Sequence, residues 1–173
     1  MAKNKNLILV GFMGTGKSVV GHELANRLGF EFVDTDEMIM KKAGKTISGI
    51  FAEHGEPHFR DLETATIRSL TALDGHVVST GGGCVQRDEN WTAMRQAGLV
   101  VCLTARPDVI YERTRRKPHR PLLQTADPLG RIRELLERRA PFYAHADHTV
   151  DTSDLTVDEV VAQVLSRWRE GQS

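Results

Sequence analysis

The sequence has few cysteines and no long hydrophobic run near its start, and each shortage excludes a class of protein. Its two cysteines, Cys84 and Cys102, lack C-x-x-C spacing, so neither a disulfide framework nor a zinc site is indicated, and we expect reduced thiols. Only four apolar residues follow the polar first segment before Gly11, which is too short for a signal-peptide core or a membrane span. We therefore expect a cytoplasmic protein that does not bind a membrane.

An excess of charge of one sign is also missing. Lysine plus arginine and aspartate plus glutamate both number 23, so the formal net charge is zero. No overall field then favours nucleic acid as a partner, and any anionic ligand must be held by local clusters of charge. The 173 residues, of which 40% are hydrophobic, suffice for one well-buried core but are few for two, so we expect a single domain over residues 1–173.

Short apolar, β-branched segments alternate with helical patterns along the chain. This alternation predicts an α/β fold, in which a parallel sheet carries helices on both faces. The expected strands are 7–10, 30–33, 76–79, 99–103 and 148–150. In the last expected helix, the apolar stripe that we assign to core packing is Val157, Val160, Val161, Val164 and Trp168.

The segment Gly11–Ser18 follows the first expected strand and fits G-x-x-x-x-G-K-[ST], the loop that wraps nucleotide phosphates. Its glycines let successive N–H groups turn toward one anion, Lys17 brings a charge to the β- and γ-phosphates, and Ser18 remains to ligate Mg²⁺. A helix that begins at Lys17 and ends at Gly29 would aim its N-terminus at the phosphates. The motif predicts binding of ATP or GTP; a glycine-rich turn with a chance Lys-Ser is the alternative.

The residues that follow the other strands are candidates too, because ligands of parallel α/β sheets bind beyond the carboxyl ends of the strands. Asp34 and Asp36 could hold magnesium-bound water or accept a proton from an attacking hydroxyl, although an Asp there could also cap a helix. Gly81–Gly83 permits close approach of a ligand to the backbone, or forms a flexible turn. No acidic residue ends the third strand, so Mg²⁺ would rest on Ser18, the phosphates, waters and Asp34.

Two arginines and one basic segment complete the candidates. A guanidinium forks onto a carboxylate through two hydrogen bonds, so Arg60 and Arg139 in one cleft would suit an acidic small molecule, although a lone arginine is more often a solvated charge. The basic segment 115–124 could close over the phosphates as a lid. A nucleic-acid patch is the rival interpretation, weakened by the lack of interleaved aromatics.

In this order, the motifs resemble those of the shikimate kinase family. They are GFMGTGKS, FVDTDEMI, FRDLE, TGGG, RPLL and RAPFY, and they extend from Leu7 to about Ser153. The resemblance implies transfer of the ATP γ-phosphoryl group to the 3-hydroxyl of shikimate, with Mg²⁺ as cofactor, on the way to chorismate and the aromatic amino acids. It also implies a three-layer fold of the nucleoside monophosphate kinase type, with a five-stranded parallel sheet and a lid, and a monomer.

The resemblance also implies the nucleotide half of the site. The residues that would contact the nucleotide are Gly14, Thr15, Gly16, Lys17, Ser18, Val19, Arg113 and Arg120. Among these, Arg113 would stack on adenine, with residues 151–153 over its other face, and Arg120 would reach the phosphates from a lid at about 115–124. Ser18 and Asp34 would lie at the metal.

For the acceptor, the resemblance implies a substrate-binding part at about 34–62. Arg60 and Arg139 would clamp the carboxylate of shikimate, Gly82 would offer its backbone N–H, and Asp36 would contact the ring hydroxyls and serve as base. Lys17, Asp36 and Arg120 are thus the expected catalytic residues. Another P-loop metabolite kinase, such as one that acts on gluconate, is the nearest alternative.

Overall fold

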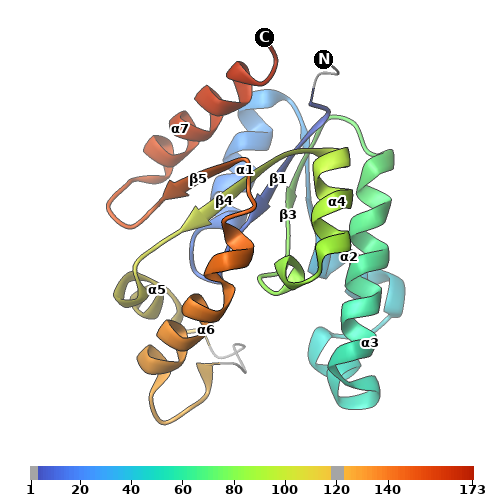
Figure 1. Ribbon diagram of the computed structural model, residues 1–173, viewed down its shortest axis with the longest axis vertical. Coiled ribbons are helices and arrows are strands. Elements are labelled where there is room, and N and C mark those ends of the chain that lie inside the picture. The colour runs from blue at the N-terminus through green and yellow to red at the C-terminus, as the bar shows by residue number, and fades with distance from the viewer. Residues whose placement is uncertain (1–3, 118–122) are drawn as a thin grey trace.

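The computed structural model describes residues 4–117 and 123–173, which form one sheet covered by helices (Figure 1). The sheet has five parallel strands in the order β2-β3-β1-β4-β5. The strands are β1 (Asn6–Val10), β2 (Glu31–Asp34), β3 (His76–Ser79), β4 (Gly98–Thr104) and β5 (His148–Asp151). Every strand expected from the sequence is confirmed to within one residue at each end. The two edge strands, β2 and β5, have only four residues each.

Helices connect the strands and lie on both faces of the sheet. The α-helices of the described residues are α1 (Lys17–Leu28), α2 (Thr35–Ala43), α3 (Ile47–Ser69), α4 (Asp88–Ala97), α5 (Pro107–Thr114), α6 (Pro128–Tyr143) and α7 (Val157–Glu170). Local signals explain their ends. Gly29 ends α1 in the left-handed conformation, with φ of 67°, and the side chain of Asp127 caps α6. Gly55 interrupts α3 with φ of 82° and ψ of 173°, so α3 is kinked there.

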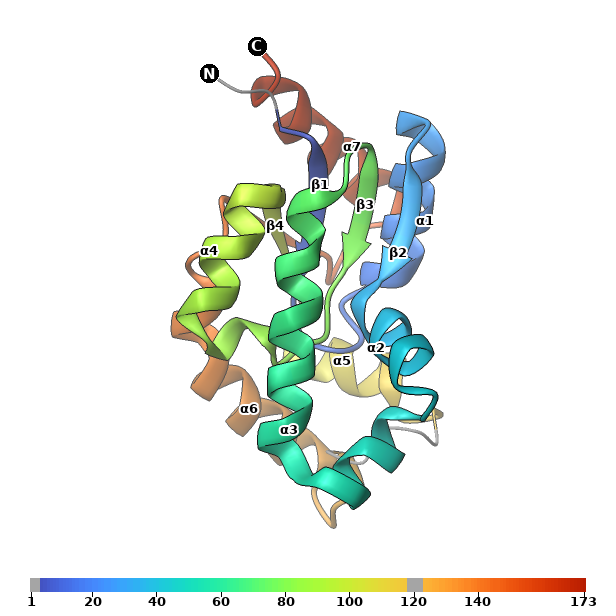
Figure 2. The ribbon, with the colours of Figure 1, turned by 90° about the vertical axis from the view of Figure 1, so that its right-hand side faces the viewer.

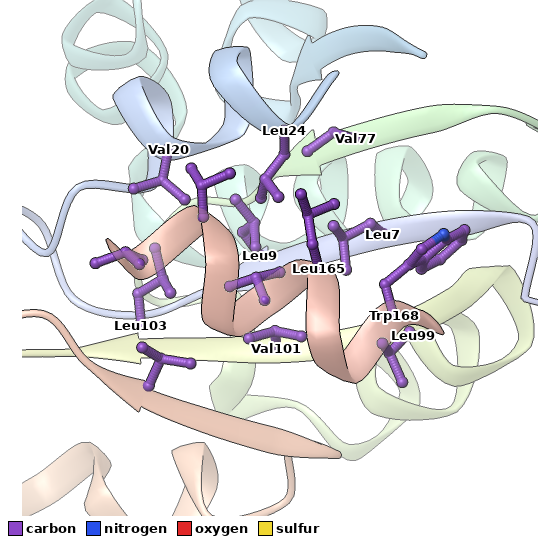
Figure 3. Close-up of a cluster of buried hydrophobic side chains, with 14 of the residues drawn as sticks. Leu7, Leu9, Val20, Leu24, Val77, Leu99, Val101, Leu103, Leu165 and Trp168 are labelled. Atoms are coloured by element: carbon purple, nitrogen blue, oxygen red, sulfur yellow. The ribbon is translucent and has the colours of Figure 1, made fainter. Parts of the chain in front are cut away.

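Two apolar layers hold the helices to the sheet. Alternate residues of β1 point to opposite faces, and Leu7 and Leu9 pack under α1 and α7 against Val20, Leu24 and Trp168 (Figure 3). The stripe predicted for α7 is confirmed at four of its five positions. Val157 is the exception, because it lies in the first turn of the helix, beside the capping residue Thr156, and is 41% exposed.

The opposite face of the sheet packs against α3 and α4. Ile8 and Val10 meet Ile67 and Met94 there, in a cluster that also contains both cysteines. Cys84 and Cys102 are free, as the sequence predicts, and both are buried. Burial raises the pKa of the Cys84 thiol to about 12 and that of Cys102 to about 11, so both stay protonated and unreactive near neutral pH.

All five strands run toward the end of the sheet where α2, α5 and α6 lie, while the described chain ends lie at the other end (Figure 2). The segments that follow β1, β2, β3 and β5 therefore meet at one edge of the molecule. Within the described ranges, no helix has both the length and the apolar character needed to cross a membrane.

Candidate active site

The loop between β1 and α1 has the conformation that its glycines predict. Gly14 and Gly16 have φ of 78° and 101°, in the left-handed region that disfavours other residues. At Gly14 a Cβ would also lie 2.6 Å from a side-chain carbon of Thr114. Gly16 is the N-cap residue of α1 and supplies no side-chain cap, so the first N–H groups of the helix are left to an anion.

Lys17 lies at the start of α1 and folds back over this loop. Its Nζ donates hydrogen bonds to the carbonyl oxygens of Gly11 at 2.6 Å and Phe12 at 3.0 Å. The hydroxyl of Thr15, which is buried, donates to the same Phe12 oxygen at 2.8 Å. Ser18 and Val19 follow on exposed positions of the helix. The ammonium therefore lies on the ligand side of the loop, within reach of a phosphate bound there.

Arg113 on α5 joins the P-loop to the segment after β5. Its guanidinium donates to the Gly14 carbonyl at 3.2 Å and to the hydroxyl and carbonyl of Thr152 at 3.0 and 2.9 Å. The Thr152 hydroxyl in turn donates to the carbonyl of Thr15 at 2.9 Å. The structure thus brings together two parts that the sequence assigned to adenine binding, Arg113 and residues 151–153.

The two aspartates after β2 have different local roles. Asp34 is the N-cap of α2, and its Oδ1 accepts the N–H groups of Asp36 at 2.8 Å and Glu37 at 3.3 Å. Asp34 is therefore a helix cap, which is the alternative that the sequence left open. Its Oδ2 takes no part in the cap. Asp36 lies in the first turn of α2, half-buried, and points toward the turn after β3.

That turn, Gly81–Gly83, is surrounded by charged side chains at contact distance. A Cβ on Gly81 would lie 2.9 Å from both Asp36 Oδ1 and Glu63 Oε2, and one on Gly83 would lie 2.5 Å from Arg60 Nη2. At Gly82 it would lie 3.3 Å from Arg139 Nη1. The four residues predicted to bind the acceptor therefore converge on this turn, and a side chain at Gly81 or Gly83 would displace a charged group from it.

Arg60 is fixed by two glutamates of its own helix, α3. Its Nη1 donates to Glu63 Oε1 at 2.8 Å, and its Nη2 donates to Glu56 Oε1 at 3.3 Å. Burial lowers the pKa of Arg60, but the neighbouring Glu63 outweighs it and the pKa is raised. Burial raises the pKa of Glu63 despite this pairing, and Asp36 adds to the rise. Oε2 of Glu63 has no hydrogen-bond partner within residues 4–117 and 123–173.

Arg139 approaches the same turn from the opposite side. It belongs to α6, is only 7% exposed, and holds its guanidinium carbon 5.5 Å from the centroid of the Phe12 ring in the P-loop. Arg60 and Arg139 thus flank Gly81–Gly83 from α3 and α6, next to the phosphate-binding loop. Two cations, one carboxylate and bare backbone suit an anionic, hydroxyl-bearing small molecule.

A model of the shikimate kinase family matches residues 13–169 of this chain. The chain belongs to the shikimate kinase family. A relative named shikimate kinase, from Caldanaerobacter subterraneus, is 47% identical over 164 residues, which are 95% of this chain and 96% of the relative. The prediction of this family from the sequence motifs is confirmed.

Solved structures agree with this family and with the predicted fold. The structure described as shikimate kinase from Acinetobacter baumannii in complex with shikimate superposes with a TM-score of 0.91 at 37% identity, and the match covers 98% of this chain and 95% of that one. A gluconokinase from Sinorhizobium meliloti reaches a TM-score of 0.60 at 18% identity, covering 99% of this chain and 95% of that one, which is a likeness in fold alone. The three-layer α/β fold with its five-stranded parallel sheet is confirmed.

Three residues of this shikimate kinase family site were not singled out from the sequence. Glu63 lies three residues after Arg60 on one helix face, and that spacing in FRDLE was a usable signal. Tyr143 lies four residues after Arg139 on α6 and donates from its Oη to the Gly82 carbonyl at 2.9 Å. Thr152 lay within the range 151–153 that the resemblance implied, but no sequence signal distinguished it from its neighbours, because its contacts join three segments far apart in the chain.

One of the residues predicted from the sequence lies outside the described ranges. Arg120 belongs to residues 118–122, which are not among the described ranges, so its predicted contact with the phosphates stays a prediction. The described part of the predicted lid before it, residues 115–117, is exposed and continues from the end of α5.

Proposed function

We propose that this chain transfers the γ-phosphoryl group of ATP to the 3-hydroxyl of shikimate. The observation that carries this proposal is the convergence of Asp36, Arg60, Gly82 and Arg139 on one turn beside the P-loop of a shikimate kinase family chain. Shikimate has one carboxylate and three hydroxyls, which is the set of groups that two arginines, a carboxylate and a backbone donor can bind. The product would feed the pathway to chorismate and the aromatic amino acids.

On the nucleotide side, residues 14–19 would bind the phosphates through backbone N–H groups and Lys17. The conformation of the loop and the open N-terminus of α1 support this, because they present several donors to one anion. Arg113 would lie against adenine, held by Thr152 and Gly14. Little covalent chemistry is then needed from the protein, since alignment and charge neutralisation by Lys17 supply most of the acceleration.

On the acceptor side, Arg60 and Arg139 would hold the carboxylate and Gly82 N–H would fix the ring. Asp36 would accept the proton of the 3-hydroxyl as that oxygen attacks the γ-phosphorus. Its position supports this role, because it lies at the same turn as both arginines rather than on the outer surface.

Magnesium fits the polar groups of the phosphate side. Within the described ranges, no cluster of three or more His, Cys, Asp or Glu residues could cage a cation. Mg²⁺ in phosphoryl-transfer sites instead takes one or two protein ligands together with phosphates and waters. Ser18 would be a direct ligand, and Asp34 would hold a bound water through Oδ2. The ion would supply neutralisation of charge on the transferred phosphoryl group.

We further propose one domain over residues 1–173, with a substrate-binding part at about 34–62 and a lid at about 115–124 that carries Arg120. Thr35 and Asp36 at the start of α2 and Arg60 on α3 lie at the acceptor turn, which supports the first boundary. We also propose that the enzyme is cytoplasmic and monomeric, in keeping with its membership of the shikimate kinase family.

A coupled assay of ADP release tests the proposal directly. We expect ADP formation to require shikimate and Mg²⁺ and to fall to background when gluconate replaces shikimate. Phosphorylation of gluconate but not shikimate would replace this proposal with the alternative kinase, and ADP release without any acceptor would contradict both.

Arg60→Lys should raise KM for shikimate roughly 10- to 100-fold, because a lysine keeps the charge beside Glu63 but loses the forked donor. KM for ATP should change less than twofold. We choose lysine rather than alanine because alanine would leave the buried Glu63 carboxylate without its cation.

Steady-state kinetics with each substrate varied in turn measures this effect. Arg68→Lys is the matched control, since Arg68 lies on the same helix but is largely exposed and pairs with Glu89. An equal rise of both KM values in the Arg60 variant would argue against a carboxylate clamp.

A further inference from the structure

The turn Gly81–Gly83 is held by hydrogen bonds on both sides of Gly82. These bonds join Gly81 N–H to Thr35 Oγ1, Cys84 N–H to the Gly81 carbonyl, and the backbone and side-chain N–H groups of Gln86 to the Gly83 carbonyl. Three successive glycines have more backbone freedom than any other tripeptide. The orientation of the turn therefore depends on these bonds and not on its own sterics.

Gly82 binds the protein through its carbonyl and leaves its N–H to a ligand. Its carbonyl accepts the Tyr143 hydroxyl at 2.9 Å. Its N–H has no acceptor among residues 4–117 and 123–173, in keeping with a donor reserved for substrate. The Tyr143 hydrogen bond holds the peptide between Gly82 and Gly83, while the bond from Cys84 N–H to the Gly81 carbonyl holds the preceding peptide, which carries the Gly82 N–H. Together the two bonds limit the φ and ψ angles of Gly82, and so where its N–H points.

Tyr143 reaches this carbonyl from the same helix that supplies Arg139. The two residues are one turn apart on α6, so their side chains lie on one face, and Arg139 Nη1 would lie 3.3 Å from a Cβ on Gly82. The ring of Tyr143 packs in the cluster beneath the turn. Burial raises the pKa of Tyr143, although Arg139 opposes the rise, so the hydroxyl keeps its proton and remains a donor.

We infer that Tyr143 is a positioning residue of the acceptor site: its hydroxyl holds the Gly82 carbonyl and so restricts the φ and ψ angles of Gly82, which keeps the Gly82 N–H and the Arg139 guanidinium facing shikimate at a set separation. This inference rests on the proposed function. Helix α6 would then contribute to shikimate binding in two ways. Arg139 would contact the substrate directly, and Tyr143 would act indirectly by holding Gly82. Preorganisation of this kind lowers the entropy that binding must otherwise overcome.

Tyr143→Phe removes only the hydroxyl and tests the inference. We expect KM for shikimate to rise roughly 3- to 10-fold, the loss of one neutral hydrogen bond, with KM for ATP unchanged. Hydrogen–deuterium exchange of the segment 80–86 should accelerate in the free variant, and this readout does not depend on activity. Tyr111→Phe is the matched control, because Tyr111 is the other tyrosine of the chain and packs on α5 in a different cluster.

The outcomes separate the inference from the function on which it rests. A wild-type protein that does not phosphorylate shikimate would overturn the proposed function, whatever Tyr143 does to exchange. An active wild type with unchanged KM for shikimate in Tyr143→Phe, or with equal rises for both substrates, would overturn the inference alone. Unchanged exchange of 80–86 would do the same, as would a variant that fails to fold, since the hydroxyl would then serve stability rather than placement.

Discussion

Lys17→Met should fold normally but lose about 10³-fold in kcat, because the variant lacks the one side-chain cation of the P-loop motif. Methionine is unbranched and close to lysine in length, so the loop should keep its shape. The hydrogen bonds from Nζ to the Gly11 and Phe12 carbonyls would be lost, and a modest fall in melting temperature is expected with them.

Circular dichroism melts and single-turnover ADP formation together measure this result. Lys5→Met is the matched control, since Lys5 is exposed and lies before β1, at the opposite end of the strand from the P-loop. Near-normal turnover in a folded Lys17→Met protein would contradict the whole kinase proposal. Loss of activity in the Lys5 variant as well would point to an unspecific effect of the substitution.

Asp36→Asn should lower kcat by about 10²-fold while leaving the protein at least as stable as the wild type. The amide keeps the shape of the side chain but cannot accept the proton of the attacking hydroxyl. Stability should not fall, because Asp36 and the buried Glu63 are like charges that both lie 2.9 Å from the Cβ position of Gly81, and Asp36 raises the pKa of Glu63. Removing one charge relieves that repulsion.

Rapid-quench kinetics and thermal melts test both halves of this expectation. Asp61→Asn is a suitable control, since Asp61 is an exposed carboxylate of α3 that pairs with Arg87. Asp34→Asn should instead show its defect as an altered dependence on magnesium concentration. If Asp34→Asn abolished turnover at saturating Mg²⁺ and Asp36→Asn did not, the roles assigned to the two aspartates would be reversed.

The sequence predicted those parts of the fold that local chemistry decides. Strands appeared where β-branched runs stood between turn residues, and Gly29 ended the first helix as its capping chemistry requires. Val157 was wrong as a core residue because helical periodicity does not say where a helix emerges from the core. Val157 is 41% exposed, whereas Val160, Val161 and Val164 further along α7 are buried.

The candidate site was predicted residue by residue only where a motif carries a side chain to the ligand. Residues that act by holding another residue in place have a weak sequence signal or none. Thr152 matters through hydrogen bonds to Thr15 and Arg113, which are 137 and 39 residues away in the chain. Such contacts depend on how the strand ends meet in three dimensions, and a single sequence does not encode that in any local pattern.

The short edge strands of the sheet have a consequence for how the protein behaves at high concentration. A chain with zero formal net charge lacks the mutual repulsion that keeps many proteins apart in solution. Exposed strand edges are the usual template for pairing between molecules, and β2 and β5 each offer only four residues for it. The strands with long apolar runs, β1 and β4, are paired on both sides inside the sheet. Protection against aggregation in this protein therefore comes from strand order rather than from surface charge.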